Sequence, residues 1–176
     1  MKKVTIATIF VALMMISSAA FAQTTASGTL TVTATINGSI QLVFNSNASG
    51  VALTNSGTNA ATLAFGAVSA FGTLPTGVTR TLGTNTFTVS SPVDVQVSKT
   101  NSTSANYKLQ AQLNNADAQN TWSVGGVSIA SGSLTQITAT GAYATSVNFP
   151  VAITVPFNNT TVLNINNSIN YVATAN

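Results

Sequence analysis

The side chains of this chain that could do chemistry are few. Its two acids are Asp94 and Asp117, its cations beyond the N-terminus are Arg80, Lys99 and Lys108, and it has no histidine and no cysteine. Acid and base catalysis, nucleophile activation and metal binding draw mainly on histidine, cysteine and clustered carboxylates. We therefore expect no enzymatic activity, no cofactor and no metal site.

The two lysines leave two chemical alternatives to weigh. A Ser–Lys pair can support nucleophilic catalysis, and a lysine beside an acid and an asparagine can form a covalent isopeptide crosslink. Lys108 lies on the polar side of an alternating segment and Lys99 lies in the polar run SKTNSTS, so both positions favour solvated surface lysines. The crosslink stays open as an alternative, with Asp94 or Asp117 as the acid.

The N-terminus has the pattern of a secretory signal peptide. Lys2 and Lys3 precede an apolar run from Val4 to Ile16, and Ala20-Phe21-Ala22 is a small-x-small cleavage site. We predict a signal peptide at 1–22 and a mature chain that is exported through the periplasm to the cell surface or the extracellular space. The apolar run is shorter than the roughly 20 residues of a membrane-spanning helix, and we expect no transmembrane segment after cleavage.

Charge is scarce in the rest of the chain. The formal net charge of +3 falls to +1 once Lys2 and Lys3 are removed. Nucleic acid is not expected as a partner, because three scattered cations cannot neutralise a phosphate backbone. A weakly charged surface lacks the repulsion that keeps proteins apart, and this favours self-association.

Alternating segments separated by Gly, Asn, Ser and Pro predict an all-β protein, a sandwich or a barrel, in a single domain over 23–176. Pro150 lacks an amide proton, so its strand should lie at an edge or carry a bulge there. A polar loop is expected over 45–59. The predicted strands are 28–36, 40–44, 61–65, 78–82, 86–89, 93–98, 107–113, 122–124, 127–130, 134–139, 147–155, 161–165 and 169–173.

The clearest alternation is in the first of these segments, GTLTVTATI. Leu30, Val32, Ala34 and Ile36 face one way and threonines face the other. The Asn-Gly turn signal at residues 37–38 follows it. This strand has two possible fates: it pairs within its own domain, or it adds to an exposed sheet edge of a neighbour, with its side chains in a groove. Head-to-tail repetition of the second contact makes an open filament.

The signal, the early strand GTLTVTATINGSIQL, the element Leu63-Ala64-Phe65-Gly66 and a last strand near the C-terminus resemble secreted bacterial fimbrial subunits of the spore coat U and archaic chaperone–usher type. The resemblance implies an immunoglobulin-like antiparallel β-sandwich that a donor strand from the next subunit completes. It implies 23–36 as that donor strand, with Leu30, Val32, Ala34 and Ile36 as groove-filling side chains. A periplasmic chaperone and an outer-membrane usher would be further partners.

The sequence thus favours a structural subunit of a surface filament (pilus or fimbria) or extracellular matrix, a homopolymer assembled by β-strand addition. The alternative is a monomeric cell-surface binding domain, adhesin-like or for glycans, with aromatic residues that stack on sugars. The candidates for stacking are Trp122, Tyr107, Tyr143 and Tyr171. Each lies within or beside an apolar strand, so we expect these rings in the core.

Overall fold

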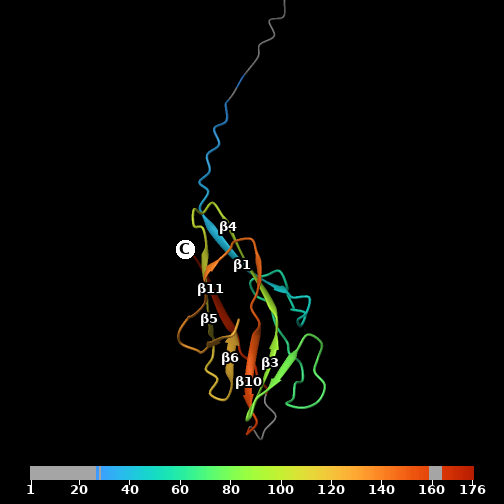
Figure 1. Ribbon diagram of the computed structural model, residues 1–176. Helices are drawn as coiled ribbons and strands as arrows, with labels where there is room; N and C mark the ends of the chain where they lie inside the picture. The colour runs from blue at the N-terminus through green and yellow to red at the C-terminus, as the bar shows by residue number, and fades with distance from the viewer. Residues whose placement is uncertain (1–26, 28, 159–163) are drawn as a thin grey trace, which may run out of the picture. The chain divides into compact units, whose positions relative to one another are not determined.

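The computed structural model describes residues 27, 29–158 and 164–176, and residues 36–176 form one compact unit. The predicted signal peptide lies outside the described residues, as do 23–26, residue 28 and most of the strand predicted at 161–165. The described chain is all-β, with eleven strands and antiparallel sheets (Figure 1). The strands are β1 Ser39–Ser46, β2 Thr79–Leu82, β3 Thr86–Ser91, β4 Val93–Thr100, β5 Tyr107–Leu113, β6 Thr121–Val124, β7 Val127–Ile129, β8 Thr135–Gly141, β9 Ser146–Asn148, β10 Val151–Pro156 and β11 Ile169–Ala175.

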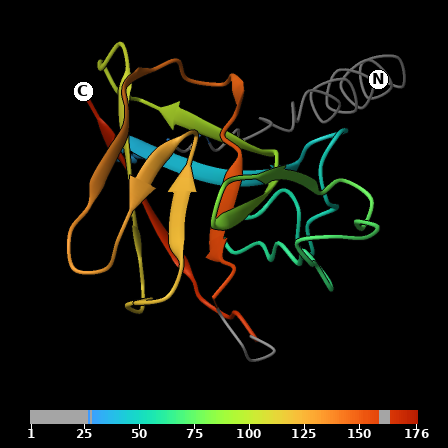
Figure 2. The same ribbon diagram turned by 60° about the horizontal axis from the view of Figure 1, so that its bottom comes forward.

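Three sheets build a sandwich. Their strand orders are β1-β4-β9, β2-β3-β10-β6-β7 and β11-β5-β8. The first two sheets follow each other along the chain, because β3 leads into β4 across Pro92 and β9 leads into β10 across Phe149-Pro150. The third sheet packs against both of them. The connection between β1 and β2 is a run of loops at one side of the sheets (Figure 2).

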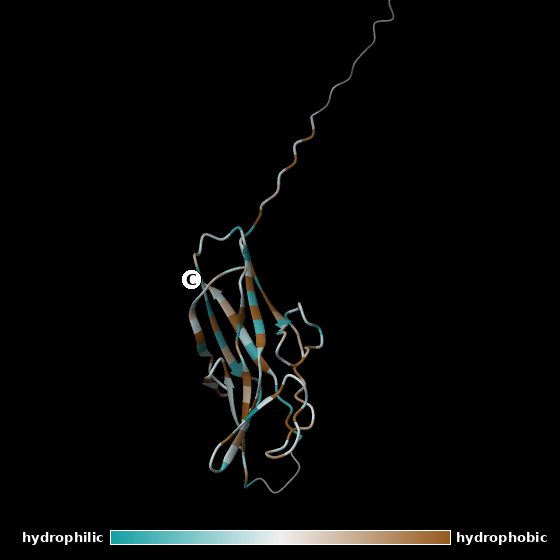
Figure 3. Ribbon diagram, turned by 45° about the vertical axis from the view of Figure 1, so that its right-hand side comes forward, coloured by the Kyte–Doolittle hydropathy of each residue, from teal (hydrophilic) through white to brown (hydrophobic). Residues whose placement is uncertain are grey.

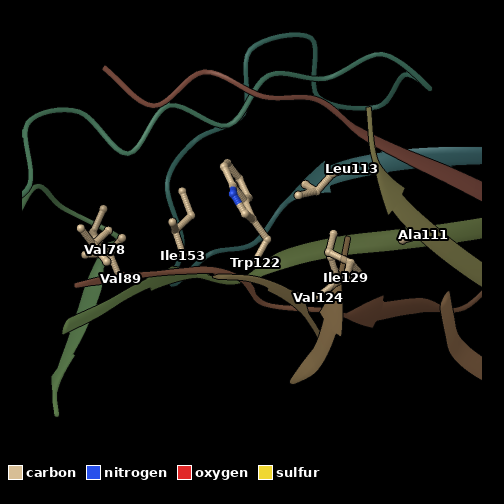
Figure 4. Packing of buried hydrophobic residues seen from close by; sticks show 9 residues of the cluster. Val78, Val89, Ala111, Leu113, Trp122, Val124, Ile129 and Ile153 are labelled. Atoms are coloured by element: carbon tan, nitrogen blue, oxygen red, sulfur yellow. The ribbon is translucent and has the colours of Figure 1, made fainter. Parts of the chain in front are cut away.

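Two apolar clusters hold the layers together. The first is shared by β4 and β5, where Val95, Val97, Tyr107 and Leu109 are fully buried. The second lies between the β10 sheet, the C-terminal end of β5 and the N-terminal end of β11. Figure 4 shows its side chains around the indole of Trp122. Brown and teal bands alternate along several strands in Figure 3. In β4 and β5 the apolar residues at every second position are buried, so each of these strands turns one face to a core.

Most predicted strands are confirmed, and the exceptions are informative. Residues 61–65 form no strand; the chain there makes a single bridge between Thr54 and Thr62, inside the β1–β2 loops. The strand predicted over 147–155 is two strands, because Pro150 cannot donate to a ladder. Residues 29–38 form no strand either.

Candidate functional site: an open seam between the first and last strands

The outer edge of β1 carries backbone groups that no described strand pairs with. Phe44 N donates to Thr58 O (2.8 Å), and Phe44 O accepts from Gly57 N (2.7 Å). Both backbone groups of Phe44 therefore point away from β4, toward the following loop. Backbone direction alternates along an antiparallel strand, so Ile40 and Leu42 point the same way as Phe44. Since β1 pairs only with β4 among the described strands, the amides and carbonyls of Ile40 and Leu42 face an open edge.

The outer edge of β11 is open in the same way. Ser168 O accepts from Asn114 N and Asn176 N donates to Asn106 O, each at 2.8 Å, so the even-numbered residues face β5. By the same alternation, Ile169, Tyr171 and Ala173 direct their backbone groups away from β5. No strand of the described chain pairs with that side of β11.

The side chains along these two edges belong to the core but are incompletely covered. Ile40, Leu42 and Phe44 of β1, and Tyr171 and Ala173 of β11, all pack on the Val95–Leu109 cluster and are only partly buried, whereas the cluster itself is fully buried. The Phe44 and Tyr171 rings meet edge to face, with centroids 5.0 Å apart, so the two edges lie side by side. We call this strip the seam; its residues are Ile40, Leu42, Phe44, Ile169, Tyr171 and Ala173.

A cavity of about 340 Å³ continues the seam at the β11 start. Phe44, Ile169 and Tyr171 are common to both, and the cavity extends to the indole of Trp122. Further apolar side chains of its wall are Leu53, Leu63 and Phe65 of the β1–β2 loops and Ile165, four residues before β11. The seam and the cavity are continuous; apolar side chains of both strands line them, together with polar residues that include 166–168. The backbone groups of Ile40 and Leu42 on one side, and of Ile169, Tyr171 and Ala173 on the other, face no strand of the described chain.

The predicted donor side chains are exposed. Leu30 is 86% exposed, Val32 80% and Ile36 75%, and Ala34 is exposed as well. The described residues of the predicted strand 28–36 form no strand.

The structure does not assemble the sparse charged residues into a reactive group. Asp117 accepts from the Trp122 indole (2.8 Å) and from Asn120, while Asp94 accepts from the Asn47 side chain (2.7 Å). Lys99 donates to Ser104 O and lies 4.9 Å from the centroid of the Tyr143 ring. No contact in the described part of the chain joins a lysine to either acid, so nothing there favours the isopeptide crosslink.

The hydrogen bonds to Asp117 stabilise the local structure and hold its carboxylate ionised. Burial tends to raise the pKa of this carboxyl, but hydrogen bonds from Trp122, Asn120 and the Gln119 amide outweigh it, and the pKa lies below its ordinary value. A carboxylate held ionised by donors is a poor general acid at neutral pH. Its role is to anchor the β5–β6 connection to the buried indole.

The aromatic residues that could stack on sugars are in the core, as expected. Tyr107 and Trp122 are buried, and Tyr143 and Tyr171 are partly buried. Tyr143 O–H donates to Asn106 O (3.0 Å), and Tyr171 packs on Phe44. A ring that packs in a core offers little open face on which a sugar could stack.

Two further properties of the described residues bear on function. They contain no group of three or more His, Cys, Asp or Glu that could hold a metal ion. Among the same residues, no helix is both long enough and apolar enough to cross a membrane.

Sequence reasoning predicted the strands that border the seam but not the seam itself. The segments 40–44 and 169–173 alternate clearly and were expected as strands, yet alternation does not reveal which edge stays unpaired. The available signal was position, since these are the first and last strands of the compact unit. No protein-family model, no curated protein and no solved structure matches the chain.

Proposed function

We propose that the protein is a structural subunit of a bacterial surface filament, a pilus or fimbria, or of an extracellular matrix. Copies join by β-strand addition: the segment 28–36 of one copy enters the seam of another. Leu30, Val32, Ala34 and Ile36 cover the seam side chains, and the backbone of the segment pairs with the open edge of β11. The observation that carries this proposal is the open, apolar seam in a chain that also exposes an alternating apolar segment.

The two partners match in spacing. Alternate side chains of a strand repeat about every 6.6 Å on one face, so the four apolar side chains form a row about 20 Å long. Ile40, Leu42 and Phe44 have the same repeat along β1, as do Ile169, Tyr171 and Ala173 along β11. A strand laid along β11 therefore brings an apolar side chain level with each of Ile169, Tyr171 and Ala173, whereas the loop at 57–58 already occupies the edge of β1 at Phe44.

The export signal and the family resemblance agree with this proposal. A predicted signal peptide sends the chain through the periplasm to the surface, where fimbrial subunits assemble. An immunoglobulin-like sandwich that lacks one strand, as the resemblance implies, would have its gap beside the last strand, and the open edge of β11 supports such an arrangement. Chaperone and usher proteins are the partners that such assembly would use.

Electron microscopy of residues 23–176, beside the same chain without 23–36, tests the proposal. We expect filaments from the first and monomers from the second. Leu30→Asp or Val32→Asp should abolish filaments, because a carboxylate in an apolar groove loses its hydration without a partner. Thr31→Asp is the matched control, since Thr31 lies on the other face of the segment and should leave assembly intact.

A well-folded monomer from residues 23–176 would contradict the proposal and favour the surface binding domain. Filaments that survive Val32→Asp would show that the segment does not join the copies. A synthetic peptide of residues 27–36 provides a second measurement. It should bind the chain without 23–36 and raise its melting temperature, because a ligand that binds only the folded state stabilises it.

A further inference from the structure

The strand β2 has an open edge of its own, apart from the seam. Among the described strands it pairs only with β3. Gly83 N donates to Thr86 O (2.8 Å), so the odd-numbered residues of this hairpin arm direct their backbone groups toward β3. By alternation, Arg80 and Leu82 direct their amides and carbonyls away from β3, where no strand of the described chain meets them.

Apolar side chains are exposed beside this edge. Leu82 is 51% exposed and lies opposite Phe87 in the β2–β3 ladder. The Phe87 ring stacks on Phe157, with centroids 6.1 Å apart, and the Phe157 ring stacks on Phe71 at 6.0 Å. Phe71 is 71% exposed and Phe157 38%. We call these four residues, Leu82, Phe87, Phe157 and Phe71, the apolar strip.

The only charge on β2 is held by a nearby loop. Natural edge strands are commonly protected from other chains by charged side chains or by proline. The strand TRTL has no proline, and its one charged residue is Arg80. The Arg80 guanidinium donates to Ser69 O (2.8 Å) and Gly72 O (3.1 Å), and so it fixes the loop that carries Phe71. A side chain bound in this way protects the edge less than one that extends into solvent.

Such an edge is complementary to the same edge of a second copy. Two β2 strands related by a twofold axis lie antiparallel, as neighbouring strands of one sheet do. With the axis at Thr81, Arg80 lies opposite Leu82 of the second copy, and both residues direct their backbone groups across the contact. Each such pair exchanges both of its hydrogen bonds. Between the two pairs, Thr81 lies opposite Thr81 of the second copy.

Charge and strand length favour this register over its neighbours. An axis at Arg80 would place like charges directly opposite each other, which is destabilising. An axis at Leu82 would place Arg80 opposite Thr84, which lies beyond the end of β2, so ladder bonds would be lost. The axis at Thr81 uses the strand from Arg80 to Leu82 and keeps the two arginines apart.

We propose that β2 and the apolar strip bind the same surface of a second copy as a weak twofold pair. Phe71, Leu82 and Phe157 together expose on the order of 300 Å² per copy, since large side chains of this kind carry roughly 150–250 Å² each. An area of that size, with the short strand edge, fits a transient contact and not a permanent dimer. The pair uses no residue of the seam, so it goes beyond the proposed function and does not depend on it.

A single introduced cysteine tests the pair, because the chain has no cysteine of its own. Opposed residues of a non-hydrogen-bonded pair have Cα atoms about 4.5 Å apart, a separation that a disulfide can span. Thr81→Cys should therefore crosslink two copies in oxidised glutathione. Thr79→Cys is the matched control: Thr79 is also exposed on that face, but its counterpart in the second copy would lie about 13 Å away along the strand.

Both variants are made in residues 23–176 with Val32→Asp, which blocks strand addition at the seam. We expect covalent dimers to form at least about tenfold faster from Thr81→Cys than from Thr79→Cys, because only the first places its thiols within disulfide distance. Equal rates, or no dimer from either variant, would overturn the pair.

Two substitutions at Leu82 test the register. In the pair, residue 82 lies opposite Arg80 of the second copy, so a lysine there meets a like charge and a glutamate meets an opposite one. Added to Thr81→Cys, Leu82→Lys should slow crosslinking at least about threefold more than Leu82→Glu. Equal effects of the two would overturn this register.

Failure of this inference is distinguishable from failure of the proposed function. Filaments are read from residues 23–176 without these changes, whereas the crosslinking rates are read from chains that carry Val32→Asp. A fast crosslink from Thr81→Cys in a protein that forms no filaments would support the β2 pair and contradict strand addition. Filaments without that crosslink would do the reverse.

Discussion

The hydroxyl of Tyr107 is buried without a hydrogen-bond partner at the centre of the core. A buried hydroxyl that makes no bond costs folding free energy, so its removal should be neutral or stabilising. We predict that Tyr107→Phe leaves the free energy of unfolding unchanged or raises it by about 1 kcal/mol in urea titrations. A loss of stability above that size would show that the hydroxyl is satisfied in solution.

Gly141 lies against the same ring, and a larger side chain there should destabilise the fold. A Cβ there would lie 2.2 Å from Cζ of Tyr107, deep in the packed core. Gly141→Ala should therefore lower the free energy of unfolding by about 1–3 kcal/mol, the usual cost of overpacking. Combined with Tyr107→Phe it should stay destabilising, because the clash is with ring carbons and not with the hydroxyl.

The buried tyrosines also predict loss of stability in alkali. Burial raises the pKa of Tyr107, with a smaller contribution from Tyr143, and burial raises the pKa of Tyr171. The unfolded chain then releases protons first, near pH 10, so the free energy of unfolding should fall as the pH rises above about 10. Urea midpoints across that range should fall less steeply for Tyr107→Phe than for the unmodified chain.

The lowered pKa of Asp117 predicts a loss of stability in acid. Hydrogen bonds hold its pKa down, so its stabilisation is present above the unfolded value of about 3.9 and is lost as the pH falls through the folded pKa. At neutral pH, Asp117→Ala should cost about 1–3 kcal/mol and shift Trp122 fluorescence, because the indole loses its acceptor. Asp94→Ala is the control: it removes one bond to Asn47 and should leave the fluorescence unchanged.

At the scale of elements, two glycines show how the β1–β2 loops dock on the sheets. A Cβ on Gly77 would lie 2.2 Å from the carbonyl carbon of Gly50, and one on Gly50 would lie 2.4 Å from the carbonyl oxygen of Pro92. The loops therefore lie directly on the break between β3 and β4. There the buried hydroxyl of Ser91 accepts from the Val51 amide (2.9 Å).

A matched pair of substitutions separates this close approach from backbone strain. Gly77 and Gly57 have nearly the same left-handed backbone, with φ 81° and 85°, but a Cβ on Gly57 meets nothing within 4 Å. Gly57→Ala should cost about 1–2 kcal/mol, the price of the left-handed backbone alone. Gly77→Ala should cost clearly more in the same urea titration; equal costs would show that the loops are not packed as described.

How much the sequence predicts depends on the element. Regular alternation located β4 and β5 closely and placed Lys108 on the polar side of β5, because a half-buried strand must alternate. It failed at 61–65, where Leu63 and Phe65 are apolar because they line the cavity and not because the segment is a strand. It also missed that the seam is open, since pairing between strands distant in sequence is set by the whole fold.

At the scale of the whole molecule, the shortage of charge and the open seam predict how assembly responds to conditions. The chain has no histidine; among its described side chains, the shifted pKa of Asp117 lies below its ordinary value and those of Tyr107 and Tyr171 above theirs. Burial of apolar side chains also involves no charge pair that salt could screen.

We therefore expect the rate of filament formation by residues 23–176 to vary little between pH 5 and 7, and little between about 0.01 M and about 1 M sodium chloride. Sodium sulfate should accelerate assembly, because excluded salts strengthen apolar burial. Light scattering with electron microscopy of the end points measures both. A fall of tenfold or more in sodium chloride would mean that charges, and not the apolar row from Leu30 to Ile36, hold the copies together.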